Sequence, residues 1–240
     1  MEQMARFIRW IQAALLSAGL GVSAGAVVAG GPVVVELYTS QGCSSCPPAD
    51  AFLAKELAKR DDVIALALHV DYWDYIGWKD DFADPAYTDR QRGYARAAGQ
   101  RTIYTPQMII GGLDHVIGSH PREVKHFISK HAEAANDVSV SLTRTGDVLE
   151  ISLDPGTVKR SRMSVQLVRY EPEATRNIKR GENAGRELLY ANIVTEWLRV
   201  GTWNMRSDRT FKANVKGDQP IVVLVQHEDH GQIVAAARLN

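Results

Sequence analysis

Two cysteines separated by two serines are the residues of this sequence best suited to chemistry. Cys43-Ser44-Ser45-Cys46 follows an apolar run and precedes a helical pattern. Thiols at this spacing at a helix start can close into a small disulfide ring. We expect the sulfur of Cys43 to project toward solvent and that of Cys46 to lie nearer the helix body. Free N–H groups and the helix dipole stabilise an anion there, so such thiols have pKa values of roughly 3.5–7.5, against about 8.5 for a free thiol.

Other uses of the cysteine pair stay open at the level of sequence. Structural zinc sites use the same spacing but normally need a second pair of Cys or His ligands, and the chain has only two cysteines. A static disulfide is a second alternative, although so short a loop removes little chain entropy. A copper or zinc site formed by Cys43, Cys46 and His69 is a third. We favour redox use of the pair and predict no cofactor.

A second signal lies about sixty residues further on, where Thr105-Pro106 directly precedes an apolar strand pattern. X-Pro bonds are the routine sites of cis peptides, and proline is tolerated at the first residue of a strand. The aromatic segment with Tyr72 and Trp73 leaves another strand pattern, at 63–70. Binding crevices of open α/β sheets lie beyond the carboxyl ends of strands. Tyr72 and Trp73 therefore either line a substrate groove beside the cysteines or pack an insertion.

The elements that must position these residues alternate between strand and helix in the first half of the chain. Apolar, β-branched runs predict strands at 33–38, 63–70 and 107–111, with a hairpin partner at 115–118. Periodic patterns predict helices at 50–60, 88–98 and 121–135. The order β-α-β-α-β-β-α predicts an α/β domain over residues 32–136, which contains every group that thiol exchange needs.

After residue 136 the pattern changes to short alternating strands separated by turn residues. We expect strands at 138–142, 148–153, 163–170, 188–194, 210–215, 221–226 and 233–239. Short strands without a long helix predict a mostly antiparallel β-sandwich domain over residues 137–240.

The first half resembles the thioredoxin fold: a strand, a CxxC motif at a helix start, a central strand, Thr-Pro, a hairpin and a final helix. The resemblance covers about residues 32–135 and implies that Pro106 is cis and packs against the disulfide. It also implies that the backbone of Thr105 pairs with an extended substrate. Thioredoxins carry a buried acid that takes a proton from the second thiol. Glu36 is the nearest match, offset by one residue, and an ordinary structural pairing is the alternative.

Longer segments resemble one narrower family. VELYTSQGCSSCPPAD, HVDYWDYIGWKDDFADP, YTPQMIIGG and GENAGRELLYANIV are similar to the DUF1223 family of exported bacterial proteins, over essentially the whole mature chain. The cysteine motif departs from many thioredoxins, because Ser44-Ser45 stands where they have Gly-Pro and Gly42 where they have Trp.

The N-terminal segment predicts export. Arg6 and Arg9 precede an uncharged stretch, and Ala24-Gly25-Ala26 suits signal peptidase. We expect residues 1–26 to be a signal peptide and the mature protein to be periplasmic or secreted, with no stable membrane insertion. An uncleaved N-terminal membrane anchor is the alternative, since the uncharged run is long enough to span a bilayer.

Charge and motifs together define the function that we expect. The chain of 240 residues carries 28 basic and 28 acidic side chains, which gives no long-range attraction to nucleic acid. We therefore expect an exported thiol–disulfide oxidoreductase in which Cys43 attacks and Cys46 resolves, with protein or small-molecule thiols and disulfides as partners. The alternative is a non-catalytic thioredoxin-like module that binds a metal ion or a partner protein.

Overall fold

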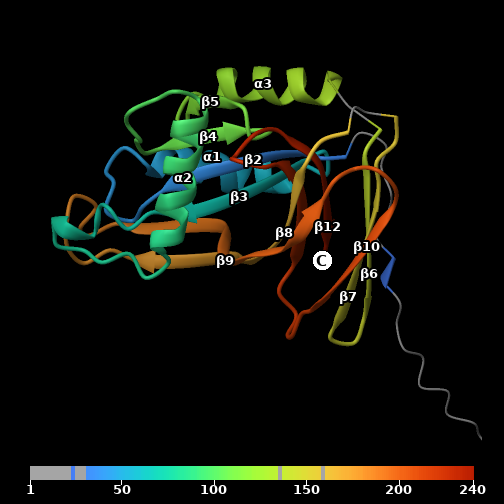
Figure 1. The fold of residues 1–240 in the computed structure, drawn as a ribbon. Helices are drawn as coiled ribbons and strands as arrows, with labels where there is room; N and C mark the ends of the chain where they lie inside the picture. Colours follow the sequence, from blue (N-terminus) through green and yellow to red (C-terminus); the bar gives the residue numbers. More distant parts are fainter. Residues whose placement is uncertain (1–22, 25–30, 135–136, 158–159) are drawn as a thin grey trace, which may run out of the picture.

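The computed structural model describes residues 23–24, 31–134, 137–157 and 160–240. They form a mixed α/β structure in which an eight-stranded sheet lies beside a four-stranded sheet (Figure 1). Each α-helix begins with a proline, which suits the first turn because the N–H that proline lacks would be unpaired there.

The elements are named in chain order. The helices are α1 (Pro47–Lys55), α2 (Pro85–Ala97) and α3 (Pro121–Glu133), with 3-10 turns η1 (Leu57–Lys59) and η2 (Asp74–Ile76). The strands of the first half are β1 (Ser23–Ala24), β2 (Val33–Thr39), β3 (Val63–His69), β4 (Gln107–Ile110) and β5 (Asp114–Ile117). The later strands are β6 (Ser139–Thr145), β7 (Val148–Asp154), β8 (Met163–Asn177), β9 (Glu187–Trp203), β10 (Arg209–Asn214), β11 (Ile221–His227) and β12 (Ile233–Leu239).

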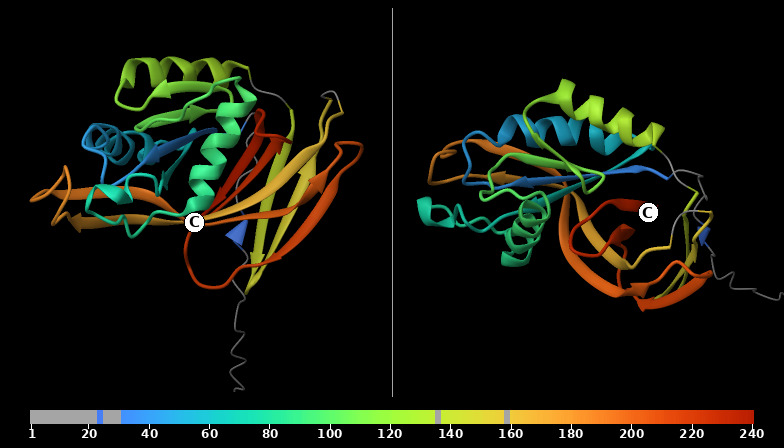
Figure 2. Two further views of the ribbon diagram at one scale, coloured as in Figure 1. Left: turned by 60° about the vertical axis from the view of Figure 1, so that its left-hand side comes forward. Right: turned by 45° about the horizontal axis from the view of Figure 1, so that its top comes forward.

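Strand β2 is buried along its whole length. Helices cover both faces of the large sheet at this strand. Successive side chains of a strand point to opposite faces. Val35 and Leu37 pack with α1 and α3, whereas Val34 and Tyr38 pack with α2. Figure 2 shows α2 on one side of the sheet and α1 and α3 on the other. A strand covered on both faces is mostly apolar, and the charged exception in β2 is Glu36, which is fully buried.

The second half of the chain extends the large sheet, which differs from the separate sandwich expected over residues 137–240. The strand order is β12-β11-β8-β9-β3-β2-β4-β5, and β9 pairs in parallel with β3 at Ala67 and Ile193. Asn192 lies at this junction with a φ of 51°, and its side-chain amide donates to the backbone oxygen of Ala65 at 2.8 Å. Residue 136 therefore does not separate two independent sheets.

The small sheet supplies one layer of a sandwich whose other layer is the far part of the large sheet. Its order is β1-β6-β7-β10. Leu142 and Ile151 from the small sheet share a buried core with Val165, Trp203 and Val223 from the large sheet. Figure 2 shows the strands of the second half curving toward the small sheet. The small sheet and this part of the large sheet share one core, and the large sheet is common to both halves of the protein.

Most of the expected signal peptide, including the expected cleavage site after Ala26, lies outside the described residues. Ser23 and Ala24 are the described exceptions, and they pair with Arg144 and Thr143 of β6. Within the described ranges, none of the helices has the length and apolar character needed to cross a membrane.

Candidate redox site

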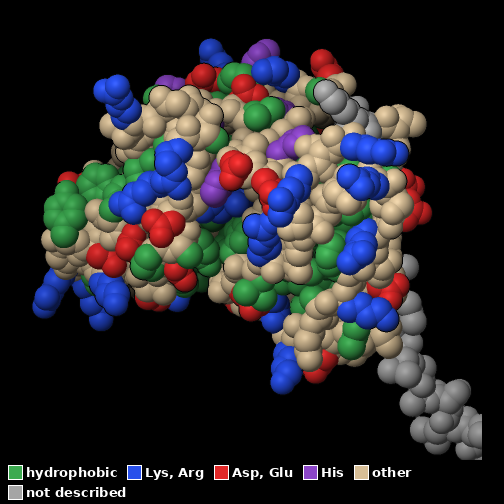
Figure 3. Space-filling view, viewed as in Figure 1, with side chains coloured by type: hydrophobic (Ala, Val, Ile, Leu, Met, Phe, Trp, Pro, Cys, Tyr) green, Lys and Arg blue, Asp and Glu red, His purple; other side chains and the backbone are tan. Residues whose placement is uncertain are grey.

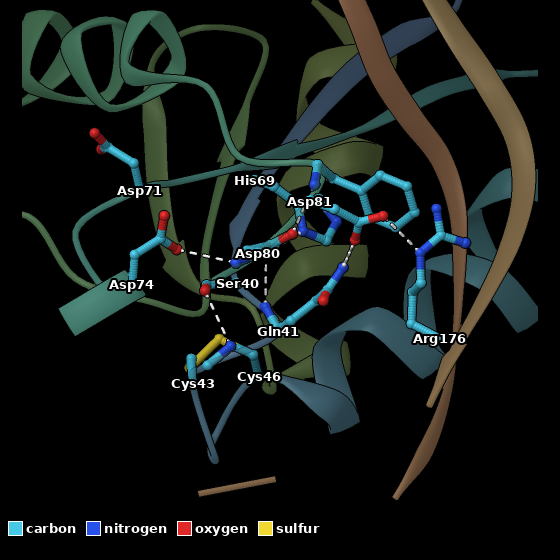
Figure 4. Close-up of polar contacts among 12 residues, drawn as sticks. Ser40, Gln41, Cys43, Cys46, His69, Asp71, Asp74, Asp80, Asp81 and Arg176 are labelled. Carbon is cyan, nitrogen blue, oxygen red and sulfur yellow. Dashed lines mark hydrogen bonds and ion pairs between the residues drawn. A yellow bond between two sulfur atoms is a disulfide. The ribbon is translucent and has the colours of Figure 1, made fainter. Parts of the chain in front are cut away.

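Cys43 and Cys46 form a disulfide, with 2.10 Å between the sulfurs and 5.4 Å between the Cα atoms. Cys46 is the N-cap residue of α1, and Cys43 lies in the turn that connects β2 to this helix (Figure 4). The Cys43 N–H donates to the Ser40 carbonyl and the Cys46 N–H to the Cys43 carbonyl, both at 3.2 Å. The turn thus closes the ring that the spacing predicts.

Both cysteines are buried, so the expectation that Cys43 projects toward solvent is wrong. Cys43 has an exposed fraction of 1% and Cys46 of 0%. The turn packs closely against the loop after β3. A Cβ atom placed on Gly42 would lie 3.3 Å from atoms of both Trp73 and Ile76. The expectation considered the helix start alone and did not include the loops packed around it.

The start of α1 also lacks the free N–H groups that were expected to stabilise a thiolate. Pro47 and Pro48 occupy the first two helical positions and carry no N–H. The next two N–H groups, of Ala49 and Asp50, donate to the Cys46 carbonyl at 2.8 and 3.1 Å. Across the described part of the chain, the one polar group within hydrogen-bonding distance of Cys43 Sγ is Ser45 Oγ, at 3.3 Å.

The peptide bond between Thr105 and Pro106 is cis, as predicted. The structure brings Thr105 beside the cysteine motif, since Ser45 Oγ donates to the Thr105 carbonyl at 3.5 Å. The indole N–H of Trp73 donates to Thr105 Oγ1 at 2.7 Å. Two of the predicted substrate-binding residues, Thr105 and Trp73, are therefore in contact with each other next to the disulfide.

The aromatic loop after β3 has one part turned inward and one part turned outward. Tyr72 is partly buried, and its hydroxyl donates to Gln91 of α2 at 3.3 Å. Tyr75 is 80% exposed and stacks on Trp73 with 6.5 Å between the ring centroids. Figure 3 shows hydrophobic side chains gathered at the end of the molecule where this loop lies. Tyr72 and Trp73 are both partly buried against the core, whereas Tyr75 extends the aromatic stack of this loop to the surface.

Glu36 faces away from the helix that carries the cysteines. Its carboxylate accepts hydrogen bonds from Arg90 Nε at 2.7 Å, Arg90 Nη2 at 2.9 Å and the Tyr94 hydroxyl at 2.6 Å. Arg90 and Tyr94 belong to α2, which covers the opposite face of the sheet from α1. Glu36 forms a buried ion pair with Arg90. The proton-relay role expected for it therefore does not fit the structure, and the ordinary pairing does.

A different acid, Asp50, lies behind the disulfide. It follows Cys46 by four residues on α1, and its N–H donates to the Cys46 carbonyl at 3.1 Å. Residues at this spacing share a helix face, and both side chains are buried. Burial raises the pKa of the Asp50 carboxyl to about 7, against a lowering effect of His69. The Cys-x-x-x-Asp spacing is the sequence signal that could have identified this acid.

His69 and Asp80 belong to the same buried region as Asp50, since both act on the pKa of the Asp50 carboxyl. Figure 4 shows the His69 ring beside Asp80. His69 Nδ1 lies 2.7 Å from Asp80 Oδ2, and both side chains are fully buried. Burial alone would lower the pKa of His69, but the Asp80 and Asp50 carboxylates outweigh it and raise this pKa. Burial, Asp50 and Asp80 together also raise the pKa of Tyr190.

This region contains polar atoms whose hydrogen-bonding capacity is unused. Among the described residues, His69 Nε2 and Tyr190 OH are buried without a hydrogen-bond partner. The Thr39 hydroxyl is close enough to Asp50 to lower the pKa of its carboxyl, although neither side chain makes a well-formed hydrogen bond. Buried polar groups are normally paired. These four side chains come from α1, β2, β3 and β9, and they can hold a proton or a buried water behind Cys46.

The connection between β8 and β9 is hydrogen-bonded to the cysteine turn. The side-chain amide of Asn183 donates to the carbonyls of Gln41 and Cys43, at 2.9 and 3.0 Å. Asp81 accepts from the Gln41 side chain at 2.7 Å and from Arg176 Nε at 2.8 Å (Figure 4). Sequence reasoning missed Asn183, because residues 140 positions apart in the chain carry no local signal of contact.

A metal site formed by Cys43, Cys46 and His69 finds no support in the geometry. The two sulfurs are bonded to each other, and His69 Nδ1 contacts Asp80. No group of three or more His, Cys, Asp or Glu side chains within the described ranges is arranged to hold a metal ion.

Comparison with known proteins places the chain in a family. A family described as "Protein of unknown function (DUF1223)" matches residues 34–226. A crystal structure of a protein from Agrobacterium tumefaciens is 36% identical, with a TM-score of 0.74 over 86% of this chain and 93% of that chain. HBP35 of Porphyromonas gingivalis is 17% identical, with a TM-score of 0.62 over 87% of this chain and 74% of that chain, a likeness in fold alone. No curated protein matches the sequence. The family match and the 36% identity show that the chain belongs to the DUF1223 family.

Proposed function

We propose that this protein is an exported thiol–disulfide oxidoreductase that works through the Cys43–Cys46 pair. The observation that carries the proposal is the position of the disulfide, at the head of α1 and next to the carbonyl of Thr105, which precedes a cis proline. A thiol, a neighbouring backbone acceptor and a nearby aromatic surface are the parts that exchange with a peptide disulfide requires.

The chemistry passes two electrons between the pair and its substrate. In the reduced protein, the Cys43 thiolate attacks one sulfur of a substrate disulfide, and the other substrate sulfur leaves as a thiolate. The Cys46 thiol then loses its proton and attacks Cys43 Sγ. This step releases the second substrate thiolate and closes the Cys43–Cys46 disulfide. The reverse sequence oxidises a substrate dithiol.

Asp50 is the group that we assign to the proton of Cys46. It shares a buried helix face with Cys46, and a carboxyl with a pKa of about 7 exchanges protons readily near neutral pH. His69, held by Asp80, provides a positive charge that stabilises the Asp50 carboxylate while the proton is elsewhere.

The arrangement of the first half supports a thioredoxin-like architecture for residues 32–136. β2 pairs in parallel with β3 and antiparallel with β4, and β5 completes the hairpin. α1 and α3 cover one face and α2 covers the other. Export is proposed from the N-terminal segment, and a disulfide suits an oxidising compartment.

The burial of Cys43 favours a second candidate, a binding module with a static disulfide. A sulfur with almost no exposed surface cannot meet a substrate unless the surrounding loops move. The two candidates differ in the reactivity of Cys43 once its partner is removed, because Cys46→Ser leaves Cys43 as a free thiol.

The test is to treat purified Cys46→Ser protein with oxidised glutathione and with a denatured disulfide-containing protein. An oxidoreductase should form mixed disulfides on Cys43 that persist, since Cys46 can no longer resolve them. Cys43→Ser, in which Cys46 is the free thiol, is the matched control and should trap far less. Equal trapping by both variants, or trapping by neither at neutral pH, would favour the static disulfide instead.

A further inference from the structure

Ser45 places one hydroxyl between two acceptors of different character. Its oxygen lies 3.3 Å from Cys43 Sγ and 3.5 Å from the Thr105 carbonyl oxygen. A serine hydroxyl has a single proton, so it can donate to only one of them at a time. The contact with Thr105 is longer than the usual O–H···O distance of about 2.7–2.8 Å. It is therefore a weak bond that can exchange for another.

The stronger of the two acceptors depends on the redox state of Cys43. In the disulfide, Cys43 Sγ is uncharged and a poor acceptor, so the carbonyl of Thr105 receives the proton. In the reduced protein, the proposed function requires Cys43 to react as the thiolate. Hydrogen bonds to charged groups are roughly twice as strong as those between neutral groups. Reduction therefore favours donation to sulfur.

The surroundings offer the Cys43 thiolate little other support. The first two residues of α1 are prolines, and the following two N–H groups donate to the Cys46 carbonyl. The titratable groups around the turn are mostly carboxylates: Glu182 accepts from the Ser44 N–H, Asp80 from the Gln41 N–H, and Asp50 follows Cys46 on the same helix face. The cationic group beside them, His69, has Asp80 as its partner. A carboxylate near Cys43 disfavours a thiolate while it is ionised.

We propose that Ser45 is a catalytic residue whose hydroxyl donates to the Thr105 carbonyl while the pair is oxidised and to the Cys43 thiolate once it is reduced. This inference rests on the proposed function. The step balances when a separate reducing dithiol supplies the electrons: its two thiols become a disulfide, and the Cys43–Cys46 bond breaks into one thiolate and one thiol. One of the two protons released stays on Cys46 and the other goes to solvent.

The change of hydrogen-bond acceptor by Ser45 on reduction, which we call the switch, has a consequence for substrate binding. An extended peptide that docks beside the disulfide needs a backbone acceptor for its N–H group, and the Thr105 carbonyl is the acceptor next to the motif. In the reduced protein this carbonyl is released when a disulfide substrate must bind. In the oxidised protein Ser45 occupies it again, which favours departure of the peptide. The partner class is therefore an extended peptide disulfide.

The first measurement follows the Cys43 thiol directly and does not depend on any enzyme assay. The rate of iodoacetamide labelling of Cys43 is measured against pH in the reduced wild type, Ser45→Ala, Ser45→Thr and Ser44→Ala. Ser44 is the matched control, because it is the neighbouring exposed serine, whereas the hydroxyl within hydrogen-bonding distance of Cys43 Sγ belongs to Ser45. We expect Ser45→Ala to raise the Cys43 pKa by about one unit, a tenfold change in the ratio of thiolate to thiol. Ser45→Thr and Ser44→Ala should retain the wild-type value.

The second measurement observes the Thr105 carbonyl. The sequence contains one Thr-Pro pair, so ¹³C-carbonyl threonine combined with ¹⁵N proline selects this carbonyl in an NMR spectrum. In the wild type and Ser44→Ala, its resonance should move on reduction as the hydrogen bond is lost. In Ser45→Ala, the oxidised protein should already show the shifted resonance, with little further change on reduction.

The outcomes separate this inference from the proposed function. A low Cys43 pKa in the wild type that Ser45→Ala leaves unchanged overturns the role of Ser45 while the oxidoreductase proposal stands. A carbonyl resonance that responds to reduction equally in the wild type and Ser45→Ala likewise overturns the switch. A wild-type Cys43 with the pKa of an ordinary thiol, about 8.5, counts against the proposed function itself.

Discussion

Asp50 makes stability depend on pH in a direction that can be measured. Its pKa is raised from 3.8 to about 7 because burial disfavours the charged form. The folded protein therefore binds the proton more tightly than the unfolded chain, and stability falls as pH rises from about 4 to 8. A shift of about three units corresponds to about 4 kcal/mol at 1.36 kcal/mol per unit. His69 acts in the same direction, since its raised pKa gives stability that is complete below about 6.5 and lost at higher pH.

Asp50→Asn should remove most of this dependence, because the amide has the shape of the protonated carboxyl and does not ionise. We expect the variant and the wild type to be about equally stable near pH 4. At pH 8 the variant should be more stable by about 2–4 kcal/mol, the lower value allowing for the carboxylate that His69 loses as a partner. Urea unfolding of the oxidised protein, followed by tryptophan fluorescence at pH 4 to 8.5, measures the difference. Asp208→Asn, at an exposed position, is the control. A stability difference that does not change with pH would refute the reasoning.

Two further predictions concern Glu36 and the second half of the chain. Glu36→Gln should lower the free energy of unfolding by about 3–5 kcal/mol, because it leaves Arg90 buried without its counter-charge. The iodoacetamide labelling rate of Cys43 should not change. A slower labelling rate would restore a relay role for Glu36. Residues 27–136 expressed alone should not unfold cooperatively in a urea titration monitored by circular dichroism, since Ile64 and Leu66 of β3 share their core with Val168 and Val222; a cooperative transition would contradict the shared core.

The sequence was sufficient to predict elements whose signal is local. All three helices and most strands occur where periodicity places them, because each pattern depends only on neighbouring residues. β8 and β9 are the exceptions, since they extend beyond 170 and 194. Residues 171–177 of β8, which include exposed Glu171 and Glu173, pair with 187–193 of β9 and form an arm with it, whereas residues 196–203 of β9 pair with 163–169 of β8. The extension of β8 is polar and has no apolar alternation to reveal it. The pairing of β9 with β3 is also hidden, since it is a contact between distant segments.

The candidate site likewise contains features that a short sequence pattern predicts and features that it does not. The cysteine motif and the cis proline were predictable because each is a short pattern with a specific geometry. Glu36 was the wrong acid for a physical reason that the sequence already contained. A shift of one residue along a strand turns a side chain to the opposite face of the sheet. Leu37 therefore faces α1, and Glu36 faces Arg90.

The second half of the chain contributes to the candidate redox site, so the proposed activity cannot be assigned to the first half alone. Asn183 fixes the backbone of the cysteine turn, and Tyr190 belongs to the buried polar region around Asp50. Asn192 joins β9 to β3, the strand that ends at His69. A displacement of β9 would therefore move Tyr190 relative to His69, whose ring centroids are 5.0 Å apart, and would strain the Asn183 contacts.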